Sequence, residues 1–113
     1  MELAIPDKKL KKALENDAER RKRFGSEMAK KIKIRMDNLA AAECLADFWP
    51  PNSGPERCHE LQGDMKGKFS IDVKQPYRLL FTVQEEREAF EEERVRWAAI
   101  KRIEIVGVED THG

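Results

Sequence analysis

The chain carries few side chains of the types that act as nucleophiles, metal ligands or acid–base catalysts. Its cysteines and histidines are Cys44, Cys58, His59 and His112, and their spacing matches no zinc site. Cys58 and His59 are adjacent, so a strand would point them to opposite faces and prevent a catalytic thiol–imidazole pair. The sequence contains no glycine-rich phosphate loop and no serine nucleophile motif. It therefore predicts that no metal and no other cofactor is needed.

Basic side chains are more informative candidates, because they bind phosphate. Arg78 stands in a strand-like run at residues 77–83, and its guanidinium offers a fixed fork of donors for a phosphate group. The same side chain has a simpler interpretation as a cross-strand ion pair with Asp72, worth about 0.2–1 kcal/mol. Spacing alone slightly favours the ion pair. Lys66 lies in a turn flanked by glycines, where a lysine usually serves solubility.

The spacing of apolar residues in the first half of the chain predicts two helices that pack against the rest of the protein. A short strand is predicted over residues 3–5, and Asp7 is a good N-cap for a helix that runs to Gly25. Ser26 is predicted to cap a second helix, which ends before a proline-rich connector at residues 48–55. The apolar face of this second helix consists of Met28, Ile32, Met36 and Leu39.

The second half of the chain changes to the period-two alternation of strands. Strands are predicted over residues 57–61, 68–73, 77–83 and 100–108. The last has apolar residues on both faces, as in an interior strand, and Gly107 is a candidate bulge. Residues 84–96 are too polar for a core strand and predict a long loop or a small exposed helix. The fold class is therefore α+β, a single domain over residues 1–113 with two N-terminal helices packed on a mostly antiparallel sheet of about four strands.

One register of the central hairpin puts all its large apolar residues on one face. The pairs in that register are Phe69–Phe81, Ile71–Leu79 and Val73–Tyr77. It places Asp72 opposite Arg78 on the other face, which the helices leave free for function. Extended backwards, it sets His59 opposite Ile71 and turns it toward the core, favouring a structural histidine. His112 is one residue from the C-terminus, where fraying is common.

The net charge of zero hides a strong asymmetry along the chain. Residues 1–38 hold 12 basic and 7 acidic residues, a balance of +5, whereas residues 84–113 have a balance of −4. Such charge runs are most often solvated helix faces. No apolar run approaches the ~20 residues of a membrane span, no signal peptide is visible, and two cysteines predict a reducing cytoplasmic location.

The middle segment of the chain contains a sequence motif with several fixed residues at fixed spacing. The stretch RCHELQGDMKG at residues 57–67, followed by YRLLF at 77–81, resembles the signature of HigB-type toxins in the RelE/ParE superfamily of bacterial toxin–antitoxin systems. That signature reads R-x-x-x-L-x-G-D-x-K-G, a strand, and a Y-R-L-x-F strand. Residues 109–112 resemble the acidic, aromatic and histidine ending of the family, with Thr111 in place of the aromatic residue.

This resemblance implies a compact α+β fold and a ribosome-dependent endoribonuclease that cuts mRNA. The chemistry would be attack of a 2′-hydroxyl on the adjacent phosphate, and metal is unnecessary because the nucleophile belongs to the substrate. It implies that Arg78 stabilises the phosphate, that Lys66 or Lys68 contacts the scissile group or backbone, and that Asp110 and His112 act as acid–base candidates. Arg57 and His59 would support RNA binding, and the basic helix carrying Lys8, Lys11 and Lys12 would hold ribosomal RNA.

The implied partners are a cognate antitoxin, expected to be a helix-turn-helix protein, together with the ribosome and mRNA. DNA would be contacted only indirectly, through the antitoxin complex. Asp72 stands where many relatives carry a basic residue, and the acidic stretch at residues 84–96 is longer than the usual turn. These departures leave a second hypothesis, a catalytically weak or inactive fold that binds an antitoxin or serves autoregulation. A gyrase-directed toxin of the ParE kind is a weaker third.

Overall fold

Residues 1–110 are described by the computed structural model, and they form helices around a five-stranded sheet. The strands are β1 (Glu2–Ala4), β2 (His59–Glu60), β3 (Lys68–Lys74), β4 (Tyr77–Thr82) and β5 (Arg102–Asp110). The α-helices are α1 (Lys8–Glu15), α2 (Asp17–Phe24), α3 (Ser26–Ala41) and α4 (Glu93–Ala99). Three short 3₁₀ helices complete the order: η1 (Leu45–Phe48), η2 (Gly63–Met65) and η3 (Arg87–Ala89).

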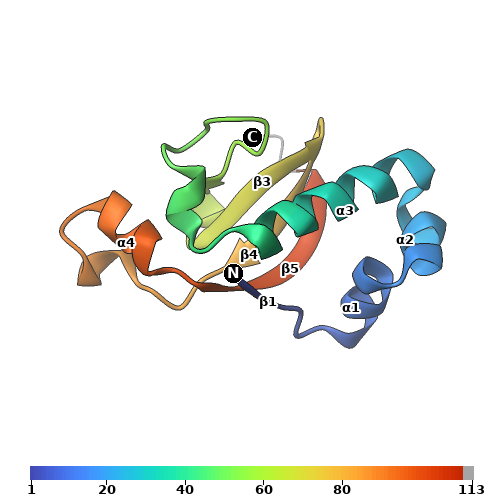
Figure 1. Ribbon diagram of the computed structural model, residues 1–113, viewed down its shortest axis with the longest axis horizontal. Helices are drawn as coiled ribbons and strands as arrows, with labels where there is room; N and C mark the ends of the chain where they lie inside the picture. The colour runs from blue at the N-terminus through green and yellow to red at the C-terminus, as the bar shows by residue number, and fades with distance from the viewer. Residues whose placement is uncertain (111–113) are drawn as a thin grey trace.

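The sheet has the order β1-β5-β4-β3-β2. β1 pairs in parallel with β5, and all the other neighbours are antiparallel. Helix α3 crosses one face of the sheet, α1 and α2 lie at one end of the molecule, and α4 lies at the other (Figure 1). The predicted α+β class is confirmed, although residues 1–110 contain four α-helices and five strands rather than two and about four.

The predicted first helix is interrupted at Asn16. Asp7 caps α1 as expected, because its Oδ1 accepts a hydrogen bond from the Leu10 backbone at 2.8 Å. Asn16 then adopts an extended backbone, and its side chain accepts from the Glu19 N–H at 2.9 Å to cap α2. Asparagine competes for helix N–H groups through its side chain, so it starts a new helix where a continuous one was predicted.

The predicted cap of the next helix was wrong by one position. Gly25 occupies the N-cap of α3 with a φ of 83°, and no side-chain hydrogen bond caps this helix. Ser26 is instead its first helical residue. Glycine allows the left-handed backbone that the tight joint between α2 and α3 requires.

One apolar core fills the space between α3, α4 and the covered face of the sheet. Its fully or nearly fully buried members include Leu14, Ile32, Leu39, Phe69, Ile71, Leu79, Phe81, Trp97, Ile103 and Ile105. Every large side chain predicted for the inner face of residues 69–71 and 79–81 is buried there. Burial of such apolar surface is the main favourable contribution to folding.

The central hairpin keeps the predicted register over most of its length. Phe69 pairs with Phe81 and Asp72 pairs with Arg78, as predicted, but Tyr77 pairs with Lys74 rather than Val73. A register shift between residues 72 and 74 accounts for this, because the connection is shorter than predicted and the extra residue is absorbed in β3. A second shift, between β4 and β5, leaves Val106 unpaired beside Gly107, where a bulge was expected.

The acidic segment at residues 84–96 was predicted to be a long loop or a small exposed helix. A small helix does form at its end, but this helix is partly buried. Helix α4 buries Arg96 and Trp97. The Trp97 ring packs edge-on against Trp49 and Phe69, with ring centroids 5.1 and 5.7 Å apart. The contacts of Trp97 with Trp49 and Phe69 thus attach the end of a largely charged segment to the core. Within residues 1–110, no helix is long and apolar enough to cross a membrane.

Replacing Trp97 with alanine should destabilise the protein severely. The change would empty a site that is 1% exposed and remove two aromatic contacts, at a cost of about 3–5 kcal/mol. Urea unfolding followed by circular dichroism measures the loss. Val95→Ala is the matched control, because Val95 lies on the same helix and is 54% exposed, so its effect should stay within about 0.5 kcal/mol. Similar unfolding midpoints for the two variants would contradict this account of α4.

Candidate functional site

The sheet face turned away from the core carries three rows of paired residues. Residues directly opposite each other in a ladder share a face, so each row brings side chains from neighbouring strands together. The rows are Lys68–Thr82–Glu104, His59–Ser70–Leu80–Gly107 and Asp72–Arg78–Glu109. The middle row is not the open surface that was predicted, because Ser70 and Leu80 are fully buried although they lie outside the main core cluster. The outer rows are polar: Glu109 is exposed, Asp72 is buried, and their other members are partly exposed.

Asp72 is the centre of the most charged cluster on this face. Its Oδ1 lies 3.3 Å from Arg78 Nε and its Oδ2 lies 3.5 Å from Arg57 Nε. Gln75 donates a further hydrogen bond to Oδ2 at 3.1 Å. The Asp72 side chain is only 11% exposed, against 53% for Arg57. Two guanidinium groups therefore face one carboxylate, and the cluster retains one positive charge.

The predicted ion pair between Asp72 and Arg78 is confirmed, and the second arginine was not foreseen in it. Arg57 lies in the connector as the structure has it, residues 49–58 between η1 and β2. It is 15 residues before Asp72, and the tertiary fold brings it to the same carboxylate. Strand alternation predicts contacts only between residues of paired strands. Arg57 lies outside the strands of the structure, so no sequence pattern indicated its contact with Asp72. The structure thus brings the predicted phosphate-binding residue Arg78 and the predicted RNA-binding residue Arg57 to the same carboxylate.

Hydrogen bonds to backbone groups hold the residues of the cluster in place. The Asp72 N–H donates to the Glu56 carbonyl at 2.7 Å, and Arg35 Nε donates to the Asp72 carbonyl at 2.8 Å. These bonds tie the connector and α3 to β3. Arg57 has a φ of 47°, a conformation that non-glycine residues rarely adopt, and its N–H donates to Ser53 at 3.1 Å. The turn therefore fixes the Arg57 backbone at a point from which the side chain reaches Asp72.

His59 lies on this face, and the prediction that it faces the core was wrong. It pairs with Ser70 rather than Ile71, so the strand is shifted by one residue from the expected register. The reason is that β2 has only two residues and follows the left-handed turn at Arg57. His59 Nδ1 lies 2.9 Å from the Arg57 carbonyl oxygen, which places the imidazole beside the arginine cluster.

The same shift turns Cys58 inward. Its side chain is completely buried in the core, and burial raises the pKa of the thiol above its usual range. A thiol that stays protonated is a poor nucleophile. No group of three or more His, Cys, Asp and Glu residues that could hold a metal ion occurs within residues 1–110.

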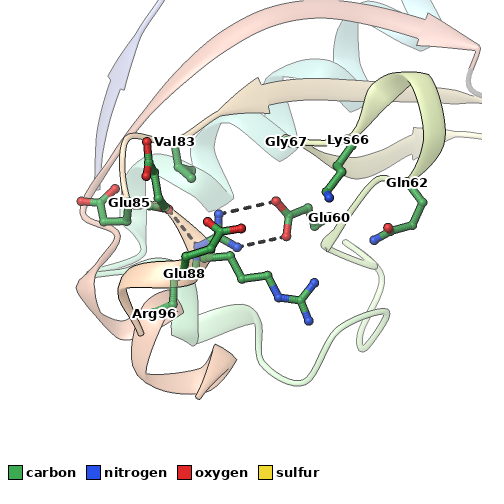
Figure 2. Close-up of a pocket in the computed structure, with 10 residues that line it drawn as sticks. Glu60, Gln62, Lys66, Gly67, Val83, Glu85, Glu88 and Arg96 are labelled. Carbon is green, nitrogen blue, oxygen red and sulfur yellow. Dashed lines mark hydrogen bonds and ion pairs between the residues drawn. The ribbon is translucent and has the colours of Figure 1, made fainter. Parts of the chain in front are cut away.

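The two predicted catalytic lysines lie away from Arg78. Lys68 pairs with Thr82, four residues along β3 from Asp72, which is about 13 Å at 3.3 Å per residue. Lys66 is exposed and lines an open pocket of about 210 Å³ together with Glu60 and Arg96 (Figure 2). Sheet geometry therefore separates Lys68 from the arginine cluster, with the middle row between them, and Lys66 lies just before β3, beside the pocket.

The pocket beside Lys66 is organised by a buried ion pair. Arg96 Nη1 donates to Glu60 Oε1 at 3.0 Å, and Arg96 Nε donates to the Glu85 carbonyl at 2.8 Å (Figure 2). The guanidinium also lies over the Phe69 ring, 5.4 Å from its centroid. All these contacts are internal, so Arg96 holds α4 against the sheet. Sequence reasoning missed Arg96, since nothing in an acidic segment marks one arginine as buried.

Two candidate catalytic residues, Asp110 and His112, lie near the C-terminus, and the structure describes only Asp110. Asp110 ends β5 opposite Tyr77, whereas its neighbour Glu109 pairs with Arg78. Strand alternation therefore directs Asp110 to the face opposite Arg78. His112 and Thr111 lie outside the described residues. The catalytic roles of Asp110 and His112 remain predictions.

The basic helices form a separate surface at one end of the molecule (Figure 1). Lys8, Lys11 and Lys12 are exposed on α1, and Lys11 makes an exposed ion pair with Glu15 at 3.8 Å. A groove of about 490 Å³ between α1 and α2 adds further cations: Lys9, Lys22 and Arg23. Arg20 does not belong to this surface, because it is buried and donates to the Leu14 carbonyl at 2.6 Å.

Comparisons with known proteins identify relatives by both sequence and structure. A family model described as the RelE-like toxin of the type II toxin–antitoxin system HigB matches residues 3–92. A YoeB/ParE toxin from Agrobacterium tumefaciens superposes with a TM-score of 0.56 at 19% identity, covering 99% of this chain and 100% of that one. No match was found among the curated proteins.

Two structures from Staphylococcus aureus show the same fold. A YoeB dimer gives a TM-score of 0.53 at 16% identity, and a YoeB–YefM complex gives 0.51 at 15%. Each alignment covers 99% of this chain and 98% of the other. At these identities the likeness establishes the fold alone.

Asp72→Asn should strengthen binding to a single-stranded RNA oligonucleotide. The substitution removes the charge that both arginines contact, so the cluster changes from +1 to +2. One added phosphate contact should steepen the dependence of log affinity on log salt by about 0.7. Fluorescence anisotropy across a salt series measures both effects. Asp64→Asn, which removes an exposed charge in η2, is the control. Equal affinities for the two variants would show that Asp72 does not limit anion binding.

Only one of the two cysteines should react in the folded protein. Cys58 is buried with a raised pKa, while Cys44 is partly exposed. A colorimetric thiol reagent at pH 8 should therefore label one thiol natively and two in urea. The Cys44→Ser variant should react only after unfolding, and rapid native labelling of that variant would contradict the burial of Cys58.

Proposed function

The chain belongs to the HigB-like family of RelE-like toxins from type II toxin–antitoxin systems, and we propose that it is a ribosome-dependent endonuclease that cuts mRNA. The observation that carries the proposal is the meeting of Arg57 and Arg78 on one face of the sheet, with one net positive charge. Guanidinium groups bind phosphate oxygens through pairs of parallel donors, so two of them suit a phosphodiester. Their fixed positions favour binding without reorganisation at the moment of reaction.

The proposed reaction uses the substrate's own nucleophile. A 2′-oxygen attacks the adjacent phosphorus, and the bond to the 5′-oxygen of the next nucleotide breaks. The reaction needs a base at the 2′-hydroxyl, an acid at the leaving oxygen and cations that stabilise the extra charge on the phosphoryl oxygens. Arg78 and Arg57 supply the cations. Asp110 and His112 stay candidates for acid–base work through their family resemblance.

The other basic residues are proposed to bind RNA away from the scissile phosphate. Lys68 lies farther along the sheet face, Lys66 lies just before β3, and both suit the mRNA backbone. His59 lies in the row between Lys68 and the arginines. The exposed lysines of α1, Lys8, Lys11 and Lys12, suit ribosomal RNA through salt-sensitive phosphate contacts. Because α1 lies at one end of the molecule (Figure 1), the proposed contacts with ribosomal RNA and with mRNA use different surfaces.

A type II toxin is paired with a cognate antitoxin, and the solved YoeB–YefM complex is a structural relative of this chain. We propose that the antitoxin here is a helix-turn-helix protein, so that DNA is contacted only through the complex. The site of action would be the cytoplasm, where ribosomes are found.

A second candidate function is supported by Asp72. Because its carboxylate contacts both arginines, their attraction for phosphate is partly neutralised in the free protein. A catalytically weak or inactive member of the family could still bind an antitoxin and take part in autoregulation. This candidate predicts a tight antitoxin complex without toxicity.

Arg78→Ala should abolish toxicity if the endonuclease proposal is right. Induced expression of the wild-type chain in bacteria should arrest growth and create new mRNA 5′ ends, detected by primer extension. Loss of a group that stabilises transition-state charge should lower the cleavage rate by about 10²–10³-fold. Arg94→Ala, at an exposed position on α4, should behave as wild type.

Two outcomes separate the candidates. Normal growth and no new mRNA ends with the wild-type chain would rule out the endonuclease. Co-purification of that inactive chain with the product of the neighbouring gene would then support the antitoxin-binding module.

A further inference from the structure

The last strand brings a carboxylate next to Arg78 that the family resemblance does not single out. Glu109 is the direct partner of Arg78 across β4 and β5, and directly opposed residues have Cβ atoms about 4.5–5.5 Å apart. It shares the face with Asp72, which pairs with Arg78 from the other side. Arg78 is therefore flanked by two acidic residues on neighbouring strands.

Gly107 gives the Glu109 side chain room to lie flat on the sheet. A Cβ built at Gly107 would be 3.8 Å from Glu109 Cγ and 3.9 Å from Cδ, so the carboxyl end folds back over the glycine. Gly107 pairs with Leu80, in the row next to Arg78. The Glu109 carboxyl group thus lies between the arginine row and the middle row.

Glu109 is also the carboxylate on this face that is available to accept a proton. Both Asp72 oxygens are engaged by arginines, and Glu104 accepts a hydrogen bond from Arg102 at 3.2 Å. Asp110, one residue later, is directed to the opposite face. Glu109 is exposed, and its carboxylate makes no ion pair or hydrogen bond with any residue in the range 1–110.

We propose that Glu109 is the general base of the RNA cleavage reaction, an inference that rests on the proposed function. Its carboxylate takes the proton of the 2′-hydroxyl as the 2′-oxygen bonds to phosphorus. The P–O5′ bond breaks, and the leaving 5′-oxygen takes a proton from solvent water. The products are a 2′,3′-cyclic phosphate and a 5′-hydroxyl end, and Arg78 offsets the charge that develops on the phosphoryl oxygens.

The test compares Glu109→Gln with Glu91→Gln, the same isosteric change at an exposed glutamate of the acidic segment, outside the candidate site. Single-turnover cleavage of ribosome-bound mRNA should be slower by about 10²–10⁴-fold in Glu109→Gln. The rate should change by no more than about threefold in Glu91→Gln, because no reacting group is removed. Sedimentation with ribosomes and the urea midpoint should match wild type in both variants, because Glu109 is exposed and its removal leaves the arginines in place.

The pH dependence of the rate provides a readout that a structural role would not change. A wild-type general base must be deprotonated, so the rate should rise with pH along an acidic limb, and that limb should disappear in Glu109→Gln. If the wild-type chain cleaves mRNA and Glu109→Gln is equally fast, or Glu91→Gln loses as much activity as Glu109→Gln, this inference is overturned and the endonuclease proposal stands. No cleavage by the wild-type chain would overturn both.

Discussion

The Asp72 carboxylate is the constraint on which the functional face depends. It is almost fully withdrawn from water, and a buried carboxylate must be matched by cations and hydrogen-bond donors. The fold meets this need with Arg57 from the connector and Arg78 from β4, while the Asp72 backbone bonds to Glu56 and Arg35. One residue therefore joins the connector, α3 and two strands, and it brings together the two guanidinium groups that the proposed chemistry requires.

A second buried charge organises the opposite end of the sheet. Arg96 lies against the Phe69 ring and pairs with Glu60 of β2, although it belongs to a largely acidic segment. Removing one partner of such a pair leaves an unpaired buried charge, which typically costs about 3–5 kcal/mol. Together with Trp97, this pair attaches α4 to the core. The long acidic stretch is thus a structured part of the fold and carries exposed glutamates at its surface.

The net charge of zero is the sum of positive and negative charges that lie on separate surfaces of the fold. Helices α1 and α2 lie at one end of the molecule and α4 lies at the other (Figure 1). The first two carry exposed lysines, and exposed glutamates precede α4 in the chain. Between them, the sheet face has cations at both ends, separated by a buried middle row. Because fields from exposed charges are screened within about 8 Å at physiological salt, each surface acts on its own partner. An overall balance near zero is therefore compatible with contacts to RNA.

The sequence by itself determined the α+β class, the core face of the hairpin and the Asp72–Arg78 pair, because alternation and helical spacing are local consequences of where apolar side chains must be buried. It also contained the motif of the toxin family. The break at Asn16, the inward turn of Cys58, the outward turn of His59 and the burial of α4 depended on contacts between distant segments. The candidate site follows the same division: strand alternation placed Arg78 on the open face, but only the tertiary structure brought Arg57 to it and set Glu109, rather than Asp110, beside it. A shift of one residue reverses the face of every side chain in a strand, and that shift is decided by turns and bulges whose energies depend on the packed fold.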